Sequence, residues 1–168
     1  MDSASSEDGE KVRATIEACN PGATIVTAES EVTLDDPKLI KGKRVLVVED
    51  GPTLTHGEMK FGAGVVAVER FDGGELVDPR PWLQGTLKET FEKYPDIGTV
   101  LPAMGYSDQQ VADLEATINS CDCDVVVSAT PIDLTRLITI NKPVDRVAYG
   151  YKDLGAPTLE SVIREKLS

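Results

Sequence analysis

The most constraining stretch of the chain is residues 45–48, where Val, Leu, Val and Val stand in a row. Such a run is typical of a strand that is buried on both faces, as in a parallel sheet. The run ends in Glu49 and Asp50, and a loop with Gly51-Pro52, two threonines and the single histidine, His56, follows. A buried strand that leads into an acidic loop rich in Gly, Pro and hydroxyl groups is the usual layout of a ligand site in an open α/β sheet.

Strand and helix signals then alternate, with about 20 to 25 residues from one strand to the next. The residue patterns predict strands at 44–49, 75–78, 99–103, 124–129 and 146–149, and helices at 61–71, 86–94, 107–120, 130–140 and 157–167. Two of the helices begin with a capping box, in which Thr86 is followed by Glu89 and Ser107 by Gln110. This rhythm predicts a doubly wound, Rossmann-like α/β fold with a mostly parallel sheet of about five or six strands and helices on both faces.

The first part of the chain is predicted to be an adjunct to this fold. Residues 10–20 show helical spacing, residues 23–28 read as a short strand, and residues 29–43 read as a connector. We therefore expect an N-terminal helix–strand adjunct over residues 1–42 and an α/β domain over residues 43–168.

Composition narrows the class of partner. The chain of 168 residues has a formal net charge of −12, which argues against a nucleic-acid or anionic-membrane surface. No apolar run reaches the ~20 residues of a membrane-spanning helix, and no signal peptide opens the chain, so a cytoplasmic location is expected. Cys121 and Cys123 stand one residue apart, which is tighter than the usual zinc spacing, and we interpret them and Cys19 as reduced thiols.

Loops that follow parallel strands gather at one edge of the sheet, so their polar residues are candidates for one site. Carboxylates there could hold Mg²⁺ through water, and threonines could donate to phosphate oxygens. The guanidinium of Arg80 could bind an anion through two parallel hydrogen bonds. The competing interpretation is structural, because carboxylates and threonines at strand ends often only cap helices or turns. The candidates are Glu49, Asp50, His56 and Arg80 for catalysis, Thr53, Thr55, Arg80, Tyr106 and Thr130 for binding substrate or phosphate, and Asp50 and Asp78 for the metal.

A response-regulator receiver domain is an alternative, because the strand at 44–49 and the pair Lys142-Pro143 are also typical of that fold. That fold needs a phosphoacceptor Asp at the end of its third strand, and this chain has Gly98 about four residues before Pro102. Glycine cannot accept a phosphoryl group, so this alternative is weak.

Longer strings resemble the cyclic 2,3-diphosphoglycerate synthetase family and related P-loop GTPase-like proteins. The resemblance runs in order over most of residues 10–150, and its strings are GKRVLVVEDGPTLTHG at 42–57, FGAG at 61–64, VDPRP at 77–81, VLPAMGY at 100–106 and SATPIDL at 128–134. It implies an ATP-dependent ligase that closes a small phosphorylated metabolite, 2,3-diphosphoglycerate, into a cyclic phosphoanhydride with the help of Mg²⁺.

The chain departs from that family because it has no Gly-x-x-x-x-Gly-Lys-Ser/Thr phosphate loop. We therefore expect it to correspond to the C-terminal part of such a ligase and to be inactive alone. Its expected partner is a P-loop domain, or a second copy of the chain in a homodimer. The alternative function is a non-catalytic α/β module that binds an anionic ligand or a protein partner.

Overall fold

The computed structural model describes residues 5–55, 60–105 and 107–168. They form two compact units, which are treated separately below. The sheet unit comprises residues 32–148, and the terminal unit comprises residues 1–31 with residues 149–168. The domain boundary expected at residue 42 stays a prediction.

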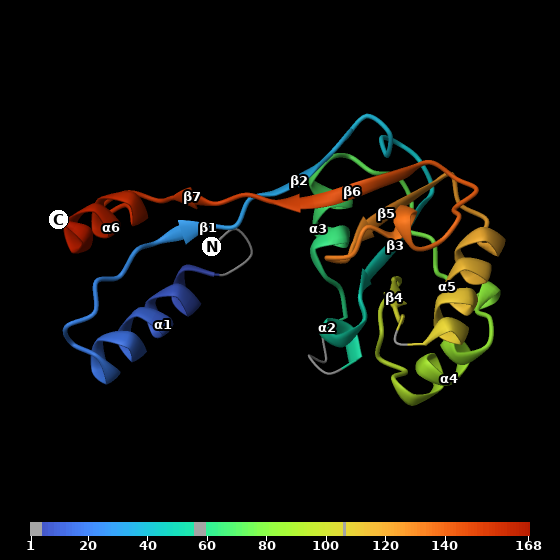
Figure 1. The fold of residues 1–168 in the computed structure, drawn as a ribbon, viewed down its shortest axis with the longest axis horizontal. Coiled ribbons are helices and arrows are strands. Elements are labelled where there is room, and N and C mark those ends of the chain that lie inside the picture. The colour runs from blue at the N-terminus through green and yellow to red at the C-terminus, as the bar shows by residue number, and fades with distance from the viewer. Residues whose placement is uncertain (1–4, 56–59, 106) are drawn as a thin grey trace. The chain divides into compact units, whose positions relative to one another are not determined.

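The sheet unit is built on five strands in the order β2-β6-β5-β3-β4 (Figure 1). These are β2 (Val32–Leu34), β3 (Val45–Asp50), β4 (Leu101–Ala103), β5 (Val125–Ala129) and β6 (Val144–Tyr149). β3 runs parallel to β4 and β5, and β5 runs parallel to β6. The edge strand β2 is antiparallel to β6, because Asp35 N–H donates to the carbonyl of Arg146 while the Thr33 hydroxyl donates to that of Ala148.

The centre of the sheet is apolar on both faces. Val45, Leu46, Val47 and Val48 have no exposed surface, and β5 beside them contributes an equally buried valine run. Helix α3 (Ala63–Arg70) covers one face, and helices α4 (Thr86–Lys93) and α5 (Asp108–Ser120) cover the other (Figure 1). This arrangement confirms the predicted Rossmann-like, doubly wound α/β fold.

One predicted strand is missing. In the segment 75–78 only Leu76 forms an isolated bridge, to Val45. The reason is that β4 pairs with Val48–Asp50 and so occupies the place beside the carboxyl half of β3. Only Val45, at the start of β3, is left to pair with the segment 75–78.

Two helical predictions also need correction. The helix expected at 130–140 is reduced to a 3-10 turn, η2 (Leu134–Arg136), because Asp133 is extended and its carboxylate accepts a hydrogen bond from Thr135 N–H at the start of that turn. Conversely, the expected loop after β3 begins with a short helix, α2 (Gly51–Thr55).

The terminal unit contains α1 (Ser6–Cys19), β1 (Ala28–Glu29), β7 (Lys152–Asp153) and α6 (Leu159–Leu167). β1 pairs with β7 in an antiparallel ribbon. Of the strand expected at 23–28, only Ala28 belongs to β1. The hydroxyls of Ser5 and Thr158 cap the two helices by accepting from the N–H groups of Asp8 and Ser161. Across the described part of the chain, no helix has both the length and the apolar character needed to cross a membrane.

Candidate functional site at the carboxyl edge of the sheet

The strand order places a switch point between β3 and β5. The chain leaves β3 for β4 on one side, and after β4 it returns to β5 on the other side of β3. In open α/β sheets, the crevice at the carboxyl ends of such strands is the usual ligand site.

A cavity of ≈ 320 Å³ lies at this switch point. The ends of β3, β4 and β5 all contribute to it, together with the turn that contains η2; its lining includes Asp50, Gly105, Thr130, Leu134 and Leu137. The wall is mostly apolar, with one carboxylate and one hydroxyl among its polar groups. Two of the residues predicted from the sequence, Asp50 and Thr130, are therefore brought together here.

Both of these side chains also hold local turns. The Oδ2 atom of Asp50 accepts hydrogen bonds from the N–H and the hydroxyl of Thr53, at 3.3 and 2.9 Å. The Thr130 hydroxyl oxygen accepts from Ile132 N–H at 3.2 Å. A capping role and a place in the cavity are thus combined in the same residues.

Two more hollows lie against α2 and α4. One, of ≈ 430 Å³, is lined by Thr55, Lys60, Lys93 and Tyr94 among others. The second, of ≈ 320 Å³, shares Thr55, Lys93 and Tyr94 and adds Glu89. The Thr55 hydroxyl donates to the carbonyl of Gly51 at 2.9 Å, a hydrogen bond within α2 itself.

The lysines are the functional candidates that the sequence reasoning missed. Within the described ranges, no ion pair joins Lys60 or Lys93 to a carboxylate, although the chain is strongly acidic. Two ammonium groups on one hollow favour an anionic group such as a carboxylate or phosphate. The available signal was Lys60, which follows β3 by ten residues; the candidates chosen from this part of the sequence were its acidic and hydroxyl residues and His56.

Glu49 lies on the opposite face of the sheet from Asp50, as successive strand residues do. Its Oε1 atom accepts from the N–H groups of Gly62, Gly64 and Val65, at 3.1, 2.9 and 3.2 Å. A Cβ atom at Gly62 would lie 2.4 Å from the other carboxylate oxygen, so glycine is required for this approach. Burial raises the pKa of Glu49, against the lowering effect of these three donors. Glu49 thus caps helix α3.

Asp78 and Arg80 form a separate cluster. The guanidinium, at the start of the 3-10 turn η1 (Arg80–Trp82), donates to the Asp78 carboxylate at 3.0 Å and to the carbonyl of Ile97 at 2.5 Å. It also lies 5.0 Å from the centroid of the Phe91 ring. Neither residue lines the switch-point cavity, so the structure does not bring Arg80 to Asp50 and Thr130.

The two predicted metal ligands, Asp50 and Asp78, do not share a site either. Asp50 lines the switch-point cavity, whereas Asp78 forms an ion pair with Arg80. In the ranges that the structure describes, no group of three or more His, Cys, Asp or Glu residues is placed to hold a metal ion. These residues therefore do not fit a complete magnesium site. His56 and Tyr106 lie outside the described residues, and their predicted roles stay predictions.

Comparison with known proteins gives one strong similarity. No family model matches the chain, and no solved structure does. A protein of Thermococcus kodakarensis named arginine synthetase ArcE is 52% identical over 165 residues, which make up 98% of this chain and 37% of that protein. The chain thus spans little more than a third of the length of this relative, and the two are homologous over nearly all of the chain.

Proposed function

We propose that this chain is the substrate-binding part of an arginine synthetase, with ATP and Mg²⁺ as the cosubstrate and metal of the complete enzyme. The observation that carries the proposal is the 52% identity to a protein of that name over 98% of the chain. The cavity at the switch point supports it, because α/β folds usually bind small molecules there. Two further hollows lie against α2 and α4.

The charges of these hollows suit an amino acid of the arginine type. Lys60 and Lys93 offer ammonium groups to an α-carboxylate, and Glu89, which lines one hollow together with Lys93, offers a carboxylate to a guanidinium. A guanidinium binds carboxylates through two parallel hydrogen bonds, which would fix the ligand's orientation. The net charge of −12 also attracts a cationic ligand to the surface.

We assign the phosphate chemistry of the complete enzyme to its part outside the matched 165 residues. A synthetase must hold ATP, and this chain has no Gly-rich phosphate loop of the Gly-x-x-x-x-Gly-Lys-Ser/Thr type. We therefore expect no ATP turnover by the 168-residue chain alone.

Cyclic 2,3-diphosphoglycerate synthesis is the second candidate, because the strings at 42–57 and 128–134 resemble that family. Its substrate is a polyanion, which a chain with net charge −12 repels at long range. The two lysines would then be the main attraction for its phosphates.

Calorimetric titration of the chain with arginine and with 2,3-diphosphoglycerate separates the candidates. We expect binding of arginine, weakened about tenfold by Lys93→Gln, which corresponds to about 1.4 kcal/mol. Lys88→Gln is the matched control, because Lys88 is exposed on the same helix and lines none of the three hollows. Binding of 2,3-diphosphoglycerate without arginine would assign the second candidate, and binding of neither would leave a module for a protein partner.

A further inference from the structure

The terminal unit has almost no interior of its own. Among the described residues 5–31 and 149–168, none is buried. By contrast, the apolar core of the protein is drawn entirely from the sheet unit, between Val32 and Val147. A unit of about 50 residues needs a buried core, or another surface to pack on, to stay folded.

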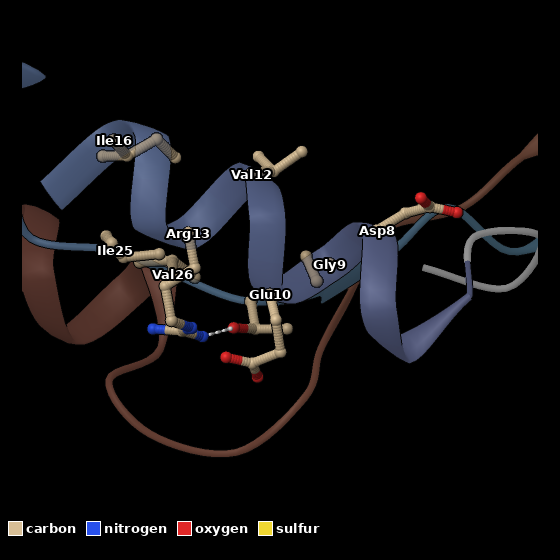
Figure 2. A pocket seen from close by; sticks show the side chains of 10 residues that line it. Asp8, Gly9, Glu10, Val12, Arg13, Ile16, Ile25 and Val26 are labelled. Carbon is tan, nitrogen blue, oxygen red and sulfur yellow. Dashed lines mark hydrogen bonds between the residues drawn. The ribbon is translucent and has the colours of Figure 1, made fainter. Parts of the chain in front are cut away.

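A groove runs between α1 and the segment 25–28 (Figure 2). It has a volume of ≈ 500 Å³, and its apolar lining includes Val12, Ile16, Ile25 and Val26. Arg13 lies at this groove and donates to the hydroxyl of Thr27 at 2.9 Å, which ties the helix to the segment. Although it is apolar, Val12 is 59% exposed.

Helix α6 carries a second apolar surface. Leu159, Ile163 and Leu167 recur every four residues and so lie on one face of the helix. Leu167 is 83% exposed and Ile163 is 47% exposed. A hollow of ≈ 460 Å³ lies here, lined by Tyr151, Leu159 and Ile163 with the charged Glu160 and Arg164. A solvent-facing helix would normally show polar residues at these positions.

We propose that the two apolar surfaces of the terminal unit, which are the groove between α1 and the segment 25–28 and the stripe on α6, dock the nucleotide-binding part of the synthetase. The inference rests on the proposed function. Its occupant is the polypeptide that the arginine synthetase relative carries beyond the matched 165 residues, which is the larger part of that protein. Exposed apolar faces of this kind mark interaction surfaces in stable proteins.

Charge specifies the partner further. Residues 1–31 contain seven Asp and Glu but only Lys11 and Arg13 as basic residues, so the surround of the groove is acidic. The docked surface should therefore present apolar side chains at its centre and Lys or Arg at its rim.

The test uses the full-length Thermococcus kodakarensis arginine synthetase with a photo-crosslinking amino acid at the position aligned with Ile163, and separately with Val12. Unlabelled and isotope-labelled enzyme are mixed, irradiated and analysed by mass spectrometry. The masses of the crosslinked peptides then distinguish contacts within a chain from contacts between copies. We expect crosslinks from both positions to peptides outside the matched 165 residues. The control position, aligned with exposed Lys88 of the sheet unit, should give none.

Crosslinks confined to the matched region, crosslinks between copies, or none at all would overturn the proposal. A direct check on this chain is sedimentation velocity: a dimer that Ile163→Glu converts to a monomer would make a second copy the occupant and would equally overturn it. Because the crosslinks report contact and the calorimetry reports arginine binding, failure of docking and failure of the proposed function give different results.

Discussion

At the scale of single residues, Glu49 shows how a carboxylate at a strand end serves the fold. It accepts three N–H donors at the start of α3 and is only 3% exposed. Replacement by alanine would leave these buried donors without their acceptor, so we expect Glu49→Ala to lower the free energy of unfolding by about 2–3 kcal/mol. Glu49→Gln keeps an acceptor and should cost less. Urea unfolding measures both, and Glu69→Gln, at an exposed position on the same helix, should change little.

The same residue makes a pH prediction. Burial raises the pKa of Glu49 above its ordinary value of 4.5, so the folded state holds this proton more tightly than the unfolded state. The stabilising contribution of Glu49 is therefore complete below pH 4.5 and is lost as pH rises through the raised pKa. We expect the stability of the wild type relative to Glu49→Gln to fall as pH rises above 4.5. A difference that stays constant, or that grows with pH, would contradict the raised pKa.

At the scale of elements, the start of α4 was not predictable from local sequence. Thr86 and Glu89 predict a capping box, but the N-cap residue is Gly85, at φ +45°, and no side chain at that position caps the helix. Instead, Asp113 of α5 accepts from both the N–H and the hydroxyl of Thr86, each at 2.8 Å. The donors at Thr86 hold the pKa of Asp113 below its ordinary value. A cap that comes from 27 residues away leaves no short-range pattern to read.

This contact predicts the behaviour of an Asp113 variant. Asp113→Ala should remove the acceptor of α4 and lower the melting temperature by on the order of 3–6 °C. Asp113→Asn, which keeps one oxygen acceptor, should fall between this variant and the wild type in differential scanning calorimetry. If Asp113→Ala melted like the wild type, the cap would be unimportant. Asp108→Ala, on the same helix but in its exposed first turn, is the control.

Other elements followed from local sequence because a local pattern decides them. The valine-rich apolar runs of β3 and β5 are typical of buried strands. The box of Ser107 and Gln110 does begin α5, with the Ser107 hydroxyl accepting from Gln110 N–H. The segment 75–78 reads equally well as a strand, but its place beside β3 is taken by β4. Which strands compete for an edge is decided by long-range packing, so periodicity cannot show it.

At the scale of the whole molecule, the same limit applies to the candidate site. The topology rule correctly brings Asp50 and Thr130 to one cavity, since both follow parallel strands next to the switch point. It does not bring Arg80 there, because the preceding segment is not a full strand and the guanidinium is held by Asp78 and Ile97. Lys93 reaches the edge from the end of a helix, which a search of strand ends does not cover.

Hydrogen exchange tests whether the two units differ in stability as their burial indicates. The residues of β3 from Val45 to Val48 have no exposed surface, and α5 buries Leu114 and Ile118 against the core. Helix α1 buries none of its residues, and a 14-residue helix without a packed face is only marginally stable in water. We therefore expect amides of α1 in the isolated chain to exchange at least about a hundredfold faster than those of α5, a helix of similar length, with β3 the slowest. Equal protection of α1 and α5 would mean that the terminal unit is stable without a covering surface, and the exposed stripe of Leu159, Ile163 and Leu167 would then need no partner. The sequence alone reveals that stripe, and the structure shows that its three side chains are exposed.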